Sequence, residues 1–338
     1  MNIFRIVPKK TDKRKYDDSP RRDVITLLLF VFLLPYVTAC LWGHIGEETE
    51  VFYREEEENE WLDRRYEVAI SGNWGKKKMT MQEYLIRKLY LVMPEEEDGA
   101  SWEIEALKAQ AVLLRTELWS LILEKEPSED GPLVIQEEAL LYPEESPDIA
   151  GSDTPYRRAV LETDGIFLSY GEEPVKAAFF PVSNGRTRNA AEALQSDKYP
   201  YLAGTECGQD IMAKQYQSQV VMEKEEYCRA VKTLFAAEGA EPELWNGITF
   251  AYDSAGYVTE AVFMDCKCSG ETFRDALHLN SASFRAEWGE EEVTFYVKGV
   301  GHGFGMSQYG AEQKAADGEL FDKILKDYFF QAELLKIE

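Results

Sequence analysis

Apolar residues repeat at helical spacing in two neighbouring stretches of the chain. They recur at intervals of four and three over residues 81–93 and alternate steps of three and four over residues 104–121. The residues are Met81, Leu85, Leu89 and Val92 in the first stretch and Ile104, Leu107, Ala111, Leu114, Leu118 and Leu121 in the second. This spacing predicts two amphipathic helices that share one core, the first ending at Pro94 and the second capped by Ser101.

Shorter patterns predict the remaining elements. Residues 126–155 are rich in Pro, Ser, Asp and Glu, which predicts a long loop. Strands are predicted at 159–162, 166–170, 175–182, 217–222, 248–252, 258–266 and 293–298, and helices at 225–237, 272–277, 308–317 and 320–329. Together they predict an α+β fold of mixed helices and mostly antiparallel strands, and 338 residues are enough for one large domain or two intertwined lobes.

A stretch of nineteen uncharged residues, 24–42, lies near the start of the chain. As a helix rising about 1.5 Å per residue, it nearly spans a hydrocarbon core of about 30 Å. Residues 1–23 hold eight basic and four acidic residues, a net of +4. Because basic flanks stay inside, we expect a cytoplasmic tail at 1–23, a single-pass transmembrane anchor at 24–42 and an extracytoplasmic part from about residue 43.

Other interpretations of this stretch remain open. Residues 37–40, Val-Thr-Ala-Cys, are similar to a bacterial lipoprotein box, so that lipidation of Cys40 is an alternative to a membrane helix. A cleaved signal and a buried core helix are further alternatives. Each interpretation is expected to leave the large acidic part at the outer face of the membrane, with residues 43–78 forming an acidic stalk and a first strand.

The charge of the chain argues against nucleic acid as a partner. The 37 Lys and Arg are outnumbered by 62 Asp and Glu, for a net charge of −25, and the part after residue 23 carries 29 basic and 58 acidic residues, a net of −29. Such a surface repels polyanions.

Four cysteines follow the apolar stretch: Cys207, Cys228, Cys266 and Cys268. Their even number in an exported part predicts a disulfide, and we expect Cys207 or Cys228 to bond one of the other two. Cys266 and Cys268 alternate along a predicted strand and face the same side, so they are not expected to bond each other. A zinc site is the alternative, with mostly thiolate ligands because the chain has three histidines.

The most specific segment is 299–311, Gly-Val-Gly-His-Gly-Phe-Gly-Met-Ser-Gln-Tyr-Gly-Ala. Glycine at every second position from 299 to 305 leaves one face bare, so that a ligand or another backbone can approach. His302 stands between two glycines and is followed by Ser307, Gln308 and Tyr309, all able to hydrogen-bond sugar hydroxyls. His302 is either a site residue or a buttress of its own loop.

This segment resembles the signature of the stage II sporulation protein D family, which includes amidase-enhancer proteins. Further resemblances follow in order, so that a domain of this family is expected over residues 79–335. They are residues 105–112 with Arg115 and Thr116, residues 183–187, residues 199–202, and residues 270–274 with Leu277 and Ser281. The resemblance implies one glycan groove lined by Gln110, Arg115, Ser183, Gly185, Thr187, His302, Gly303, Ser307, Gln308 and Tyr309.

Members of the family act on the cell wall of spore formers, at the engulfing septum. The resemblance implies a lytic transglycosylase for glycan strands whose stem peptides have been removed, working beside an amidase and another membrane protein of engulfment. One carboxylic acid is enough for this chemistry, without a cofactor: it protonates the glycosidic oxygen and then takes a proton from the C6 hydroxyl, closing an anhydro ring.

The resemblance implies that this acid is a Glu that stands directly before a Met-Pro pair. Here Val92 precedes Met93 and Pro94, and a valine cannot transfer a proton; losing a general acid costs about 10²–10⁴ in rate. Glu95, or the next residue Glu96, is the alternative acid, although a carboxyl on a loop needs burial to stay protonated.

Three interpretations therefore remain. The first is a glycan-binding protein with weak or absent cleavage. The second is a working lytic transglycosylase with a relocated acid. The third is an interaction protein whose acidic surface meets a basic partner. Glu83 and Glu105 are interpreted as structural, through bonds to backbone or to Arg115.

Overall fold

The computed structural model describes residues 61–72, 75–95, 101–125, 132–136, 153–236 and 245–337. All described residues belong to one compact unit, residues 59–338. The predicted cytoplasmic tail, membrane anchor, stalk up to residue 60 and lipidation site at Cys40 lie outside them. Within the described ranges no helix is both long enough and apolar enough to cross a bilayer.

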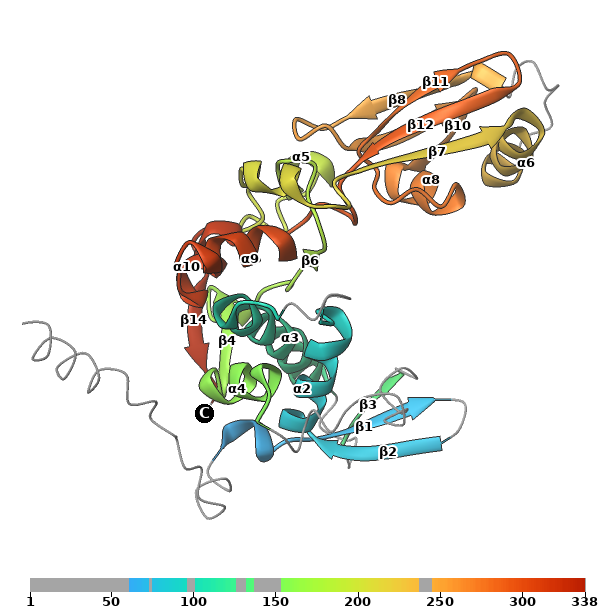
Figure 1. Cartoon of the computed structure of the whole chain (residues 1–338). Helices are drawn as coiled ribbons and strands as arrows, with labels where there is room; N and C mark the ends of the chain where they lie inside the picture. Colours follow the sequence, from blue (N-terminus) through green and yellow to red (C-terminus); the bar gives the residue numbers. More distant parts are fainter. Residues whose placement is uncertain are drawn as a thin grey trace, which may run out of the picture. The chain divides into compact units, whose positions relative to one another are not determined.

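Helices and strands alternate irregularly along the chain (Figure 1). Up to residue 212 the elements are η2 (Leu62–Arg64), β1 (Glu67–Gly72), β2 (Gly75–Thr80), α2 (Met81–Val92), α3 (Ile104–Glu124), β3 (Leu133–Gln136), α4 (Pro155–Glu162), β4 (Ile166–Tyr170), β5 (Glu173–Pro174), β6 (Phe179–Phe180), α5 (Ala190–Ala193) and η5 (Gly208–Met212). There follow β7 (Gln217–Glu223), α6 (Lys224–Phe235), β8 (Ile248–Tyr252), β9 (Val258–Phe263), β10 (Cys266–Ser269), α8 (Gly270–Ala276), β11 (Phe284–Trp288) and β12 (Glu292–Lys298). The last are β13 (Met306–Ser307), α9 (Gln308–Ala316), α10 (Phe321–Tyr328) and β14 (Glu333–Lys336).

The fold is α+β, as predicted, and most strand pairs are antiparallel. Among the described strands only β1 with β3 and β13 with β6 run parallel. Three-stranded sheets form in the orders β2-β1-β3, β14-β4-β5, β10-β9-β8 and β11-β12-β7.

One hydrophobic cluster gathers around the two predicted helices, α2 and α3. The hydroxyl of Thr80 accepts a hydrogen bond from the Glu83 N–H at 3.2 Å and caps α2. Helix α3 begins after Glu103, so the prediction of Ser101 as its cap is wrong. The Glu103 N–H instead donates to the Glu312 carboxylate at 2.9 Å, which ties the start of α3 to α9. The buried faces of α4, α9 and α10 complete this cluster.

A second hydrophobic cluster is formed by the sheets β10-β9-β8 and β11-β12-β7 with α6 and α8. Phe273, Phe284 and Phe295 lie at its centre, with ring centroids 5.6–6.3 Å apart. Its residues, 222–297, fall between the two parts of the chain that build the first cluster, 68–207 and 306–337. The two cores are therefore intertwined in sequence.

Several local predictions are wrong. Residues 159–162, predicted as a strand, belong to helix α4, which Thr154 caps and Pro155 starts. The strand predicted at 258–266 is too long: residues 258–263 form β9, a turn with Met264 at φ +53° follows, and Cys266 begins the paired strand β10. Of the strand predicted at 175–182, only the two residues of β6 pair as a strand. The loop predicted at 126–155 includes strand β3, paired with β1.

The predicted disulfide is also wrong, because Cys207, Cys228, Cys266 and Cys268 are all free thiols. Cys207 packs in the first cluster, whereas Cys228 and Cys268 pack in or against the second. Burial raises the pKa of the Cys207 thiol to about 12, so that it stays protonated at neutral pH.

Candidate functional site

The glycine-rich segment lies against another stretch of backbone, residues 178–184. Gly299, Gly301, Gly303 and Gly305 all have φ between +73° and +106°. A Cβ on Gly305 would stand 2.0 Å from the Ala178 carbonyl oxygen, and one on Gly299 would stand 2.7 Å from that of Val182. The bare face of the segment is therefore occupied by another stretch of backbone and not by open space for a ligand. This close approach explains why only glycine fits these positions.

His302 bonds to its own loop. Its Nδ1 accepts a hydrogen bond from the Phe304 N–H at 3.1 Å, and its ring lies 5.5 Å from that of Phe180. Burial, with the positive charges of Arg274 and Arg188, lowers the pKa of His302, so that the ring is neutral at pH 7. These contacts support the loop that carries His302. His302 is nevertheless partly exposed, so that it reaches the surface.

Asp210 joins the two most specific motifs. Its Oδ2 accepts hydrogen bonds from the Ser183 N–H at 2.7 Å and from the Ser307 hydroxyl at 2.6 Å. The Ser307 hydroxyl in turn accepts from the Gly310 N–H at 3.2 Å and caps α9. Burial raises the pKa of the Asp210 carboxyl. No sequence motif pointed to Asp210, because its partners are 27 and 97 residues away.

Arg188 is the second unpredicted residue. It is 3% exposed, and its guanidinium pairs with Asp253 at 2.6 Å and with Glu271 at 3.1 Å. It lies over the rings of Tyr257 and Phe304, at 5.1 and 4.6 Å from their centres. Arg188 thus connects α8 and the glycine-rich segment through charge and cation–π contacts.

Gln308 links the start of α9 to the end of α2. Its side-chain Nε2 donates to the Val92 carbonyl at 3.1 Å and to Gln110 Oε1 at 3.2 Å. Gln110 is fully buried, and its own Nε2 has no acceptor among the described residues. The predicted site residues Val92, Gln110 and Gln308 therefore do come together.

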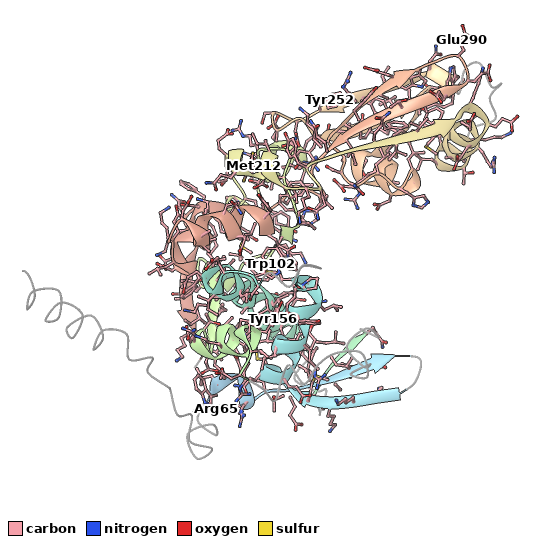
Figure 2. The ribbon with its side chains drawn as sticks, viewed as in Figure 1. Arg65, Trp102, Tyr156, Met212, Tyr252 and Glu290 are labelled. Atoms are coloured by element: carbon pink, nitrogen blue, oxygen red, sulfur yellow. The ribbon has the colours of Figure 1, made fainter. Side chains whose placement is uncertain are left out.

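The segment after Val92 is held by two aromatic side chains, labelled in Figure 2. The Tyr156 hydroxyl donates to the Met93 carbonyl at 2.9 Å, and Trp102 Nε1 donates to that of Pro94 at 2.8 Å. Glu95 follows directly and is exposed, so it lacks the burial that a general acid requires. Glu96 lies outside the described residues.

Arg115 is placed differently from the prediction. It is fully buried, and its guanidinium donates to the Asp63 carboxylate at 2.6–2.9 Å and to the carbonyls of Val160 and Ile166 at 3.1 Å. Its predicted role in lining a groove is therefore wrong; Arg115 braces the core. Glu83 and Glu105 pair with Arg87 and Lys108, not with Arg115.

The remaining predicted residues divide by exposure. Ser183 and Thr187 are buried, and the Thr187 hydroxyl accepts from the Thr205 N–H at 2.8 Å. Gly303 is buried with its would-be Cβ 2.6 Å from the Tyr257 ring. Only Gly185 and Tyr309, beside His302 and Val92, are partly exposed in this set. Most of the predicted residues thus position the site and do not line it.

The zinc alternative finds no ligand set in the described ranges, where no group of three or more His, Cys, Asp or Glu side chains is placed to hold a metal.

These features define a class: an α+β protein with two cores, in which the glycine-rich segment contacts residues 183–187, the Ser/Gly loop, through Asp210 and the end of α2 through Gln308. The family profile described as SpoIID, Stage II sporulation protein, matches residues 74–170. Stage II sporulation protein D of Bacillus amyloliquefaciens is 30% identical over 272 residues, which cover 78% of this chain and 76% of that protein. The protein of that name from Bacillus subtilis (strain 168) is 29% identical with the same coverage. The chain belongs to the stage II sporulation protein D family.

Proposed function

We propose that the protein binds glycan strands of the peptidoglycan during septal wall remodelling in engulfment, with weak or absent cleavage. Membership of a sporulation family supports the cell-wall role. The loss of cleavage is inferred from the side chain at position 92.

The observation that carries this proposal is the contact at the end of α2. Gln308 holds the Val92 carbonyl and the Gln110 side chain together, and the buried Gln110 Nε2 is left without an acceptor in the described part of the chain. An unpaired buried donor costs about 1–3 kcal/mol. A glutamate at position 92 would supply a carboxyl group at the end of α2, whereas valine has no proton to give.

The surface that meets glycan is proposed to be the partly exposed set, Val92, Gly185, His302 and Tyr309. The buried residues act through these: Asp210 fixes the loop, and Gln308 fixes the end of α2. A neutral His302 can hydrogen-bond a sugar hydroxyl without attracting counter-charge.

Tethering is the second part of the proposal. Residues 24–42 are uncharged and follow a basic tail, so we infer a single membrane pass with the folded part outside, or a lipid on Cys40. A cell-wall amidase and other engulfment membrane proteins are the proposed partners, because an amidase supplies strands free of stem peptides.

The rival function is active cleavage by Glu95. Its place directly after Pro94 favours this, and its exposure argues against it. The third alternative, an interaction protein that ignores glycan, has the acidic composition in its favour.

Two measurements on the full-length protein in detergent separate the three. Sedimentation with amidase-treated peptidoglycan tests binding, and we expect most of the protein in the pellet. Mass spectrometry of the supernatant tests cleavage, and we expect few or no 1,6-anhydro ends. Abundant anhydro ends that vanish in Glu95→Gln would establish the rival, and failure to sediment would favour the interaction protein.

A further inference from the structure

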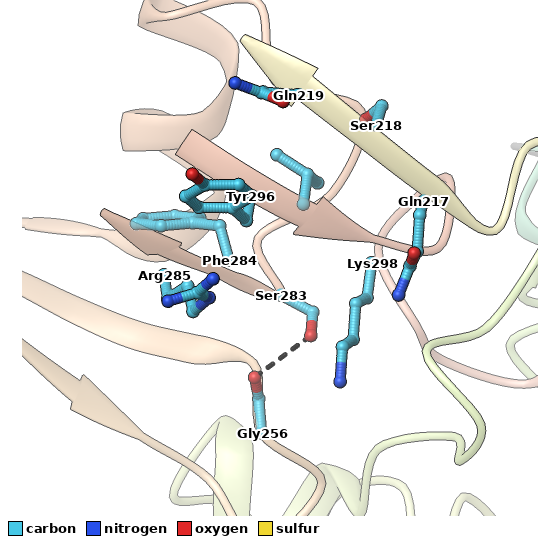
Figure 3. A pocket seen from close by; sticks show the side chains of 10 residues that line it. Gln217, Ser218, Gln219, Gly256, Ser283, Phe284, Arg285, Tyr296 and Lys298 are labelled. Atoms are coloured by element: carbon cyan, nitrogen blue, oxygen red, sulfur yellow. Dashed lines mark hydrogen bonds between the residues drawn. The ribbon is translucent and has the colours of Figure 1, made fainter. Parts of the chain in front are cut away.

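The second core carries a cavity of about 600 Å³ that the family motifs do not account for. Figure 3 shows it from close by, on one face of the sheet β11-β12-β7 and beside the turn at Gly256. None of the predicted glycan-binding residues lines it. The polar and aromatic residues that line it include Gln217, Gln219, Ser283, Arg285, Tyr296 and Lys298.

The alternation of β12 explains why this face is open and polar. Val293, Phe295 and Val297 are buried in the second core, so Tyr296 and Lys298 point to the opposite face. The register places Tyr296 between Arg285 of β11 and Gln219 of β7, and Lys298 opposite Gln217. Cross-strand neighbours on one face stand about 4.5–5.5 Å apart, so these side chains form one continuous surface.

Three polar side chains on this surface make no hydrogen bond or ion pair with other described residues. Gln217 and Gln219 are exposed, and neither side chain makes a hydrogen bond within the described chain. Lys298 is exposed and forms no ion pair with any described carboxylate, although the protein has a net charge of −25. A free cation among amides, in a strongly acidic protein, favours an anionic ligand.

Tyr296 adds an aromatic surface to this polar set. The ring is half-exposed, and the Arg285 guanidinium carbon lies 4.2 Å from its centre. Arg285 also pairs with Glu287, which balances its charge. An aromatic ring flanked by amides suits the mixed apolar and hydroxylated surface of a sugar, and a small phosphate has no ring to place on Tyr296.

The cavity adjoins the Ser/Gly loop. The Ser283 hydroxyl donates to the Gly256 carbonyl at 3.1 Å, drawn as a dashed line in Figure 3, and accepts from Asn184 Nδ2 at 2.8 Å. Asn184 also donates to the Ala255 carbonyl at 2.7 Å. A polymer that contacts Gly185 can therefore continue onto the sheet face.

We propose that this cavity binds a saccharide carrying a carboxylate, with the sugar ring on Tyr296, its polar groups on Gln217 and Gln219, and the carboxylate on Lys298. In cell-wall glycan this sugar is N-acetylmuramic acid, whose lactyl carboxylate is free once the stem peptide is absent. The inference rests on the proposed function and adds to it a second contact that selects strands with free carboxylates.

The test is a ligand-observed NMR titration of the full-length protein with three probes: N-acetylmuramic acid, N-acetylglucosamine and glycerol phosphate. The expected order is N-acetylmuramic acid bound about tenfold tighter than N-acetylglucosamine, because a charge-assisted bond to Lys298 is added. Glycerol phosphate is expected to bind most weakly.

Two variants assign the contacts. Lys298→Met should bind both sugars equally, and Tyr296→Leu should weaken both. The control is Lys267→Met, which removes an exposed lysine from strand β10 and should change neither. Equal binding of the two sugars by the unaltered protein, no effect of Lys298→Met, or glycerol phosphate bound as tightly as N-acetylmuramic acid would each overturn the inference.

Sedimentation of the same variants with amidase-treated peptidoglycan separates this inference from the proposed function. If the protein sediments but shows no Lys298-dependent preference, the inference alone fails. If the preference is present but the protein does not sediment, the proposed function fails and the cavity remains a site for acidic sugars.

Discussion

Replacing Arg115 by methionine tests whether this arginine belongs to the core. Arg115→Met removes a fully buried guanidinium and leaves the Asp63 carboxylate, 0% exposed, without its partner. Breaking a buried ion pair from one side costs about 3–5 kcal/mol of unfolding free energy. The carbonyls of Val160 and Ile166 also lose a donor, which favours the upper end of that range.

Equilibrium urea unfolding of the full-length protein, followed by tryptophan fluorescence, measures this change. For a slope of about 3 kcal/mol per molar urea, the midpoint should fall by roughly 1–1.7 M. The double variant Asp63→Leu with Arg115→Met removes both charges and should recover part of the loss. The control is Arg158→Met, whose surface pair with Glu162 contributes at most about 1 kcal/mol.

A loss below about 1 kcal/mol for Arg115→Met would refute this reasoning. So would a variant of unchanged stability that no longer sediments with glycan, since that is what a groove residue would give.

Three further predictions concern the glycine-rich segment with the adjoining loop, Asp210, and the free cysteines. Gly305→Ala should destabilise the protein by more than about 2 kcal/mol, because the added Cβ would stand 2.0 Å from a backbone oxygen. Gly185→Ala has open space around it and should cost about 1 kcal/mol through its positive φ alone. Urea unfolding compares the two variants, and equal losses would contradict the packing of Gly305. Asp210 has a raised pKa, so its contribution to stability is greatest at acid pH and is lost as the pH rises through the folded-state pKa; Asp210→Asn should therefore gain stability relative to the unaltered protein between pH 4 and pH 7, and a gain in the opposite direction would exclude this linkage. Without reductant, the exposed Cys266 should react with iodoacetamide in the native protein, and Cys207 should react only after denaturation, as read by mass spectrometry. If Cys266 or Cys207 stays unreactive in denaturant without reductant, that result would support the disulfide.

The elements that could be predicted from the sequence are those whose signal is local. Helices α2 and α3 follow from their apolar spacing, and strand β12 from its alternation. The second half of helix α4 was predicted as a strand because a short apolar run, residues 159–161, fits either structure. Thr154 and Pro155 ahead of it were the missed signal.

Only part of the site could be predicted, because only part of it has a local signal in the sequence. The glycine-rich segment and Gln308 stand out by composition, and they do lie at the end of α2. Asp210 and Arg188 do not, because their partners are brought to them by the two cores from 27 to 114 residues away. The burial of Arg115 in the core could not be predicted either, because it depends on the same long-range packing.

We propose that cleavage is weak or absent because Val92 stands where a proton donor is expected. The direct measurement is the yield of 1,6-anhydro ends from amidase-treated peptidoglycan for the unaltered protein, Val92→Glu and the matched neutral variant Val92→Gln. We expect a gain of about 10² or more for Val92→Glu and none for Val92→Gln. High yield from the unaltered protein, or no gain in a folded Val92→Glu that still sediments with glycan, would contradict it.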